Sequence, residues 1–369
     1  MHWSEKYKIP YSEFMCFQKE VIRKIETMSE GLTVENLMAD IFIRLTRRFE
    51  KVFYGGNDNP LPHLMDGMDW LSREIDLINT DFDELEYKVN KLSGVLGFTV
   101  PKKELKKGPV HLETANFYET FFRDYDVSLY DEAVDFTKQR HDRNDIEYSW
   151  FKDKVGLDAG CGSGRYTIAY SRLGAKQMYG LDNGEGALLN ATSILGELGI
   201  KNVSFVTGDC LALYFGNEYF DFVLSHGVLH HTPDIELGLQ ETFRVLKGGG
   251  FLWLQLYGDG LFWKVNDVFR ALAKKISYSL LVKRMQDMGF NPNRIFIFLD
   301  NAHVPICNVF TWDQAETLVE GVGFKVVKRI LRDVQTDEYV SDNEQIASKM
   351  PYADLRWGEG SVKLLLQKP

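Results

Sequence analysis

The stretch VGLDAGCGSGRYTIAYSRLGA, residues 155–175, decides how the larger part of this chain folds. An apolar run typical of a buried strand reaches Asp158, glycines follow at Gly160, Gly162 and Gly164, and a helical pattern continues from there. A glycine loop between a strand and a helix brings backbone N–H groups close to a ligand at the helix N-terminus. The stretch therefore predicts a nucleotide-type site in an α/β domain.

The spacing of the glycines separates this loop from two other nucleotide-binding patterns. A dinucleotide loop needs GxGxxG, whereas here GxGxG is followed by Arg165 and Tyr166. A triphosphate loop would end in GK[ST], which this stretch lacks. Asp158 would repel a pyrophosphate and suits a ligand that carries positive charge. The loop therefore favours a cationic nucleoside.

Strand and helix patterns alternate beyond the loop, which predicts a doubly wound, mostly parallel α/β sheet of seven strands. Polar residues follow successive strands: Asp182 with Asn183, Asp209 with Cys210, and Ser225. Ligands of such sheets lie along the carboxyl edge of the strands, so these side chains are expected to line one site. A single Asp after a strand is more often a turn or cap residue. The ordered series of acids beside the glycine loop favours binding.

Several of these motifs together resemble those of the class I S-adenosylmethionine-dependent methyltransferases. LDAGCGSGR, LDNGEGAL and VTGDCLAL carry the resemblance, and FDFVLSHGVLHHTPDIELGLQETFRVLKGGGFLWLQLY is similar to the ubiquinone-biosynthesis-like subgroup. The resemblance covers the chain from about Asn116 to its end. It implies S-adenosyl-L-methionine as the cofactor, S-adenosyl-L-homocysteine as the product, and no metal.

The resemblance also implies roles for individual residues. The glycine-loop backbone would hold the methionine part, with Asp158 near its amino group. Asp182 would bind the ribose hydroxyls and Asp209 the adenine amine, with a backbone contact from Cys210. Both Cys161 and Cys210 are expected to be packing residues rather than nucleophiles. The expected cofactor-binding set is Asp158, Gly160, Cys161, Gly162, Gly164, Asp182, Asn183, Asp209, Cys210, Ser225 and Tyr125.

Methyl transfer is an in-line displacement in which alignment and exclusion of water do most of the work. His230 and His231 are candidate general bases, although a structural role in the turn before Pro233 is a slightly better interpretation for either one. The pair lacks the spacing and the third ligand of a metal site. Substrate contacts are expected from Tyr118, Tyr257, Trp263 and His303, each of which could instead be a packing residue.

The first 108 residues predict a separate helical domain, and residues 109–369 a methyltransferase domain with a substrate-cap insertion at about 258–310. Apolar residues repeat at heptad spacing over residues 61–96. This stripe fits both packing within a helical bundle and a homodimer, and we expect the N-terminal helices to form a homodimer. Its members are Leu61, Leu64, Met68, Leu71, Ile75, Ile78, Phe82, Leu85, Val89 and Leu92.

Bulk properties narrow the function further. The formal net charge of −10 disfavours a general nucleic-acid binder. No apolar run reaches spanning length and the four cysteines are scattered, so we expect a soluble, cytoplasmic protein. Residues 261–285 mix basic and aromatic residues, which fits a lid helix better than membrane-surface contact. We expect a small-molecule methyltransferase; alternatives are a tRNA or protein methyltransferase, or a non-catalytic cofactor-binding scaffold.

Overall fold

The computed structural model describes residues 8–28, 32–55, 59–96, 127–290, 302–331 and 360–369, with residues 295, 298, 299, 355 and 358. The contacts divide the chain into two compact units. The helical unit comprises Met1–Gly108, Gly260–Val304 and Asp354–Arg356, and the sheet unit comprises Pro109–Asp259, Pro305–Ala353 and Trp357–Pro369. Most of the segment that the sequence suggested as a substrate cap, Gly260–Val304, thus groups with the N-terminal helices.

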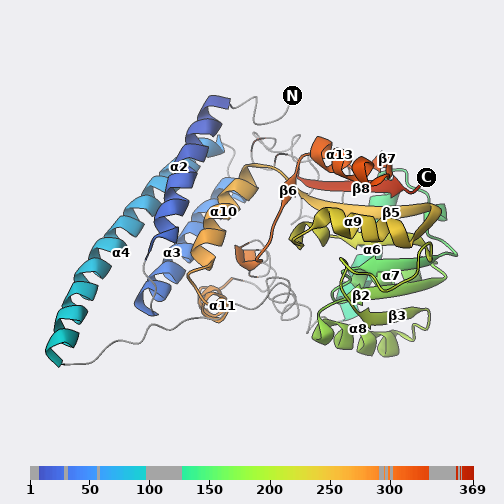
Figure 1. Ribbon diagram of the computed structural model, residues 1–369, viewed down its shortest axis with the longest axis horizontal. Helices are drawn as coiled ribbons and strands as arrows, with labels where there is room; N and C mark the ends of the chain where they lie inside the picture. Colours follow the sequence, from blue (N-terminus) through green and yellow to red (C-terminus); the bar gives the residue numbers. More distant parts are fainter. Residues whose placement is uncertain are drawn as a thin grey trace. The chain divides into compact units, whose positions relative to one another are not determined.

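The sheet unit is built on one sheet with the strand order β3-β2-β1-β4-β5-β8-β7 (Figure 1). The strands β1 to β5 pair in parallel, and β8 is antiparallel to both of its neighbours. The strand bounds are β1 Val155–Ala159, β2 Gln177–Asp182, β3 Val203–Thr207, β4 Phe220–His226, β5 Leu246–Gly258, β6 Val309–Phe310, β7 Lys325–Arg329 and β8 Ser361–Gln367.

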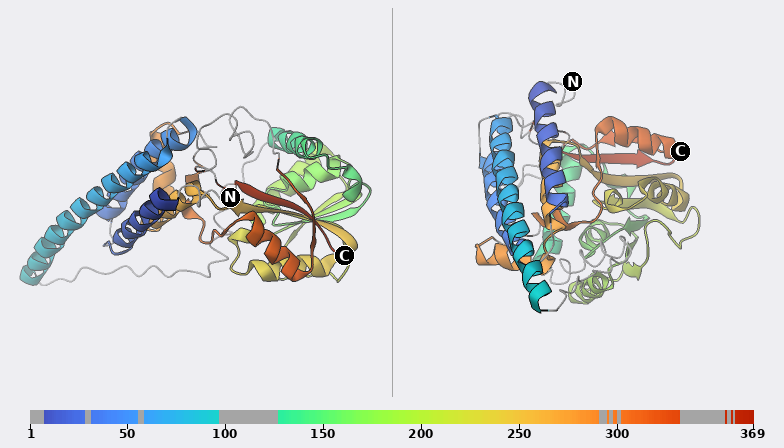
Figure 2. Two further views of the ribbon diagram at one scale, coloured as in Figure 1. Left: turned by 90° about the horizontal axis from the view of Figure 1, so that it is seen from above. Right: turned by 60° about the vertical axis from the view of Figure 1, so that its left-hand side comes forward.

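Helices cover both faces of this sheet, which confirms the predicted doubly wound architecture (Figure 2). On one face α9 and α13 pack on apolar side chains of β4, β5 and β8, and on the other α6 and α7 border an aromatic core around Trp253 and Phe222. The helix bounds are α6 Val127–Arg143, α7 Arg165–Arg172, α8 Glu185–Leu198, α9 Ile235–Val245 and α13 Trp312–Val322.

One strand was not expected from the sequence. The two-residue β6 pairs in parallel with the end of β5, at Tyr257 and Gly258. It adds an eighth strand to the seven that the sequence predicts. Two residues are too few to show the alternation by which a strand is recognised in a sequence.

The helical unit contains the long helices α2, α3 and α4, which the sequence predicts, together with two later helices. A short π-helical turn, Lys51–Gly55, continues α3. On α4, the described part of the heptad stripe from Leu61 to Ile78 is buried by packing within this unit. Packing in a bundle therefore accounts for that part, and the side chains of Phe82, Leu85, Val89 and Leu92 lie outside the described residues. The bounds are α2 Lys8–Glu26, α3 Leu32–Glu50, α4 Pro60–Leu96, α10 Leu261–Ala273 and α11 Tyr278–Asp287.

The apolar face of α10 packs on the N-terminal helices. The ring of Phe269 makes edge contacts with Phe42 and Phe49, at centroid distances of 5.1 and 5.4 Å. Phe262 contacts Phe53 in the same way at 5.4 Å. Edge-to-face aromatic pairs of this kind stabilise a helix interface beyond the area that they bury. This face of α10 is consequently a bundle interface, so membrane contact through it stays a prediction without structural support.

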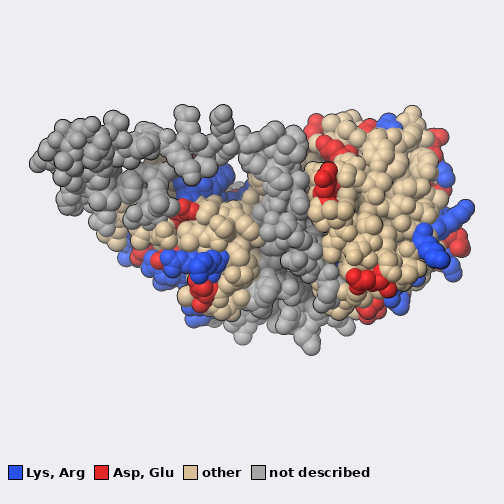
Figure 3. All heavy atoms as spheres, turned by 90° about the horizontal axis from the view of Figure 1, so that it is seen from below, with Lys and Arg blue, Asp and Glu red and all other residues tan. Residues whose placement is uncertain are grey.

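The described surface that Figure 3 shows carries scattered charged side chains of both signs among uncharged residues. Several form ion pairs with neighbours, such as Arg44 with Glu74 and Lys283 with Asp287. Within the described segments, none of the helices is long and apolar enough to cross a membrane.

Candidate functional site

The predicted cofactor residues lie at the carboxyl ends of neighbouring strands. In the sheet, β1 lies between β2 and β4, and β2 lies between β1 and β3. Asp158 on β1 pairs with Gly180 on β2 and with Leu224 on β4, one residue before Ser225. The strand order therefore brings the acids, the glycine loop and Ser225 to one edge.

The glycine loop has a backbone that only glycine adopts easily. Gly160, Gly162 and Gly164 have φ angles of +85°, +52° and +75°. The N–H groups of Gly160 and Cys161 donate to the carbonyl of Leu181, at 2.8 and 3.0 Å, which fixes the start of the loop against the end of β2. The glycine loop ends at the N-terminus of α7, where an anionic ligand group is favoured.

Asp182 ties the loop to the end of β2. Its Oδ2 accepts from the N–H of Gly162 at 2.7 Å, and its Oδ1 accepts from the N–H of Gly184 at 2.9 Å. Burial raises the pKa of the Asp182 carboxyl, while these backbone donors lower it. Each carboxylate oxygen has two lone pairs, so both keep the capacity to accept a further hydroxyl.

Asp158 is buried between the sheet and α7. It is 2% exposed, and the hydroxyl of Thr167 donates to its Oδ2 at 2.7 Å. Burial raises the pKa of Asp158 to about 7. A cation placed beside this carboxyl would stabilise its ionised form, so the position suits a positively charged ligand group.

Asp209 begins the loop after β3 and is exposed. Its Oδ1 accepts from the N–H of Leu211 at 2.8 Å, an Asx-type turn that leaves Oδ2 available to a ligand. Next to it, burial raises the pKa of the Cys210 thiol to about 12, and burial also raises the pKa of Cys161. Both thiols stay protonated at neutral pH, which suits packing residues rather than nucleophiles.

Ser225, near the end of β4, and His230, in the short turn after β4, are buried polar residues of the sheet unit. The two ring nitrogens of His230 and the hydroxyl oxygen of Ser225 have no hydrogen-bond partner within the described structure, and both side chains are 0% exposed. Burial lowers the pKa of His230 well below its usual range, so its imidazole is neutral at pH 7. Unpaired buried polar atoms are costly, and a ligand or water is the usual partner.

His141 shows what a purely structural histidine looks like in the same unit. Its Nδ1 donates to the carbonyl of Thr137 at 2.7 Å, and its Nε2 accepts from the indole of Trp150 at 3.2 Å. His231 likewise donates from Nδ1 to the carbonyl of Ile306 at 2.8 Å and so fastens the chain before β6. Of the histidine pair expected to hold a base, His230 is the better candidate.

Of the expected substrate residues, Tyr257 belongs to the same unit as this site. The ring of Tyr257, near the end of β5, lies 4.0 Å from that of His230 between centroids. Trp263 and His303 belong to the helical unit. Tyr118 and Tyr125 lie outside the described residues, so their roles stay predictions.

Sequence reasoning overlooked two residues beside the glycine loop. Thr167 is the hydroxyl partner of Asp158, and the ring of Tyr166 lies 4.0 Å from that of His226 between centroids. Arg140 on α6 donates to the hydroxyl of Tyr166 at 2.8 Å. The only signal in the sequence was their place in the first turn of α7, which directs side chains toward the loop.

Comparison with known proteins agrees with this geometry. Residues 157–254 match a family model described as a methyltransferase domain. A ubiquinone biosynthesis O-methyltransferase from Pseudomonas fluorescens is 33% identical over 148 residues, which are 38% of this chain and 60% of that protein. A demethylmenaquinone methyltransferase from Lactococcus lactis is 41% identical over 96 residues, 26% of this chain and 38% of that protein. The chain thus spans less than two thirds of the length of either relative.

A solved S-adenosylmethionine-dependent methyltransferase from Aquifex aeolicus is 15% identical, with a TM-score of 0.39 over 67% of this chain and 100% of that one. Among the residues that the structure describes, no group of three or more His, Cys, Asp or Glu side chains is arranged to hold a metal ion. Residues 157–254 of this chain are thus similar to a methyltransferase domain, and the relatives that match them are methyltransferases.

Proposed function

We propose that this chain transfers a methyl group from S-adenosylmethionine to a small-molecule acceptor. The observation that carries the proposal is the row of carboxylates Asp158, Asp182 and Asp209 along one sheet edge, with the glycine loop anchored to the middle one. A cationic nucleoside has a charge, a ribose and a base to match such a row. The quinone-pathway names of the two relatives support a small acceptor rather than a macromolecule.

Each acid has one role in this proposal. Asp158 lies near the ammonium group of the methionine part, and Asp182 accepts from the ribose hydroxyls. Asp209 accepts from the exocyclic amine of adenine through Oδ2. The N-terminus of α7, just after the glycine loop, lies toward the carboxylate of the cofactor.

The acceptor is placed at the ends of β4 and β5, beside His230 and Tyr257. The acceptor's lone pair forms the new bond to carbon, and sulfur keeps the electron pair of the bond that breaks. Because burial makes His230 a weak base, it contributes mainly by accepting a hydrogen bond that orients the acceptor.

Calorimetry on the full chain tests cofactor binding. We expect S-adenosylmethionine to bind and NAD to bind much more weakly. Asp182→Asn should raise the Kd for S-adenosylmethionine about tenfold or more, because it loses charge-assisted hydrogen bonds to the ribose. Asp221→Asn is the matched control: Asp221 accepts from the N–H of Val155 at 2.9 Å at the opposite edge of the sheet, where β1 and β4 begin.

Methyl transfer itself is read as S-adenosylhomocysteine formed over a panel of acceptors that includes hydroquinones, amines and thiols. His230→Ala should lower turnover with the best acceptor while leaving the Kd for S-adenosylmethionine unchanged. Equal affinity for NAD would reject the cofactor assignment. Cofactor binding with no turnover on any acceptor would reject the catalytic assignment and favour a scaffold.

A further inference from the structure

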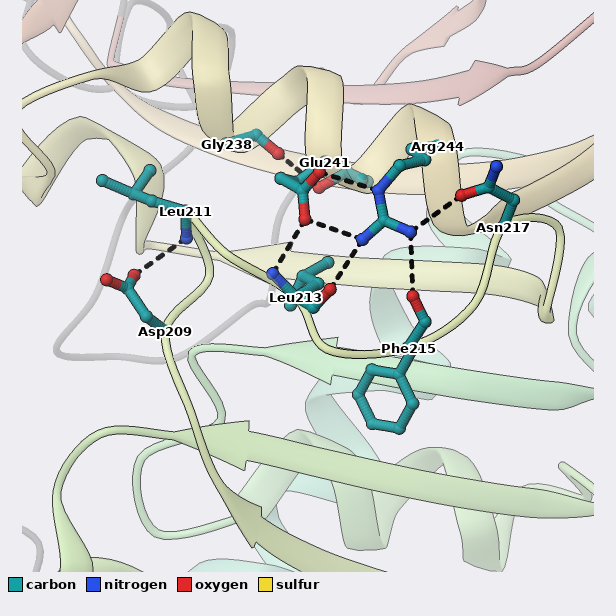
Figure 4. Close-up of polar contacts among 9 residues, drawn as sticks. Asp209, Leu211, Leu213, Phe215, Asn217, Gly238, Glu241 and Arg244 are labelled. Atoms are coloured by element: carbon teal, nitrogen blue, oxygen red, sulfur yellow. Dashed lines mark hydrogen bonds and ion pairs between the residues drawn. The ribbon is translucent and has the colours of Figure 1, made fainter.

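One ion pair on α9 holds the loop that joins β3 to β4 (Figure 4). This loop, residues 209–219, has no helix or strand of its own. Glu241 and Arg244 lie three residues apart on α9, and Figure 4 shows both side chains pointing at the loop. The path of the loop must therefore come from contacts outside regular structure.

The guanidinium of Arg244 reaches three loop residues. It donates to the carbonyl of Leu213 at 2.6 Å, to the carbonyl of Phe215 at 2.8 Å, and to Oδ1 of Asn217 at 3.0 Å. Glu241 completes the arrangement, since its Oε2 accepts from the N–H of Leu213 at 2.8 Å. One pair of side chains thus satisfies both backbone groups of Leu213 and the carbonyl of Phe215.

The pair itself is rigid. Nε and Nη2 of Arg244 donate to the two oxygens of Glu241, each at 2.7 Å, and the side chains are only 30% and 18% exposed. Bidentate, charge-assisted bonds are the strongest and most directional of protein hydrogen bonds. Without the pair, the polar backbone of Leu213, a residue 4% exposed, would lose its partners. The loop would then be free to take other paths.

The held loop carries Asp209 at its start. Upstream, the N–H of Gly208 donates to the carbonyl of Asp182 at 2.9 Å, which fixes one side of Asp209. Downstream, Asp209 accepts from the N–H of Leu211, two residues before the clamped Leu213. Asp209 therefore lies between an anchor on β2 and the anchor on α9.

We propose that Arg244 and Glu241 are positioning residues for the base end of the cofactor site: by clamping Leu213 and Phe215 they aim Asp209 at the exocyclic amine and so set selectivity for adenine. This inference rests on the proposed function, because it needs Asp209 to meet the base. Neither residue touches the cofactor. Their effect reaches the ligand only through the loop.

Two ligands that differ by one amine isolate this effect. Adenosine carries the exocyclic amine and purine riboside lacks it. For the full chain, calorimetry should show adenosine binding about tenfold more tightly, as for one hydrogen bond to a charged group. Arg244→Met and Glu241→Gln should each bring the ratio of the two Kd values close to one, while the Kd for purine riboside changes less than threefold.

Arg329→Met is the matched control. Arg329 binds Glu316 through the same bidentate geometry, at 2.6 and 2.7 Å, on β7 and α13 of the same unit. This variant should keep the tenfold preference. Arg244→Lys keeps the positive charge but cannot make the bidentate hydrogen bonds, so it should give an intermediate ratio of the two Kd values. The same variant tests the proposal if Arg244→Met fails to fold.

The outcomes separate the two proposals. If the clamp variants keep the adenosine preference, or weaken both ligands equally, the positioning inference is overturned. If the wild-type chain binds S-adenosylmethionine but does not prefer adenosine, the inference falls while the cofactor assignment stands. If the wild-type chain does not bind S-adenosylmethionine, the proposed function fails, and the inference with it.

Discussion

Replacing Asp158 with Asn should make the free energy of unfolding less dependent on pH. The carboxyl is 2% exposed, and burial raises its pKa from 3.8 to about 7. A raised pKa in an acid means that the folded state binds the proton more tightly than the unfolded state. The ionised carboxyl therefore lowers stability progressively as the pH rises from about 4 to about 7, and the cost is complete above that.

The size of the effect follows from the shift. The difference between 3.8 and about 7 is about 3.2 pKa units, which at about 1.36 kcal/mol each corresponds to about 4.4 kcal/mol when the pH is above both pKa values. At pH 5 only about 1.7 kcal/mol of this is expressed, so about 3 kcal/mol separates pH 5 from pH 8.5. Asn keeps the shape of Asp158 and an oxygen that accepts from the hydroxyl of Thr167. The substitution therefore removes only the ionisation of the side chain.

Urea unfolding of both proteins, followed by fluorescence at pH 5 and at pH 8.5, measures this difference. Relative to wild type, Asp158→Asn should gain about 3 kcal/mol between the two values. His141 and His303, whose pKa values burial lowers to about 4, are common to both proteins and cancel. A difference that does not change with pH would refute the reasoning from burial.

Two further pairs of substitutions test the packing. Gly160→Ala should cost about 2–4 kcal/mol in thermal unfolding, because φ is +85° and the new Cβ would lie 2.4 Å from Val228. Gly199 has a φ of +66° and nothing within 4 Å of its new Cβ, so Gly199→Ala should lose only the about 1 kcal/mol that the left-handed backbone costs. Equal losses of stability in the two variants would contradict the clash with Val228. On α4, Leu71→Ala should cost about 2–5 kcal/mol in urea unfolding and Leu77→Ala less than about 0.5. Leu71 is 0% and Leu77 62% exposed, so similar values would contradict their assignment to opposite faces.

The parts of the fold that the sequence predicted correctly are those with a local signal. The glycine loop, the strands β1 and β2 and the long helix α4 to Leu96 can each be recognised from a pattern of residues that are close in the sequence. The partner of an amphipathic face has no such signal. The apolar residues along one face of α10 indicate that this face is buried. Only the structure shows that Phe42, Phe49 and Phe53 cover it.

The residues of the candidate site likewise include some that the sequence predicts and some that it does not. The acids after successive strands could be ordered from sequence, because the strand order of a doubly wound sheet brings them to one edge. The roles of His141 and His230 could not be distinguished from the sequence. His141 is hydrogen-bonded to Thr137 and Trp150, whereas the ring nitrogens of His230 have no hydrogen-bond partner in the described structure. Such contacts join residues that no short pattern connects.

The division of the chain between its units affects how it is synthesised. The N-terminal helices end at Leu96, but α10, which covers their apolar side, begins only at Leu261. Ribosomes add roughly 5–20 residues per second, so about 160 intervening residues correspond to roughly 10–30 s. During that interval the rings of Phe42, Phe49 and Phe53 lack their final partners. The nascent helices therefore expose these rings until α10 is made, and a gene shortened at its 5′ end would expose the matching face of α10.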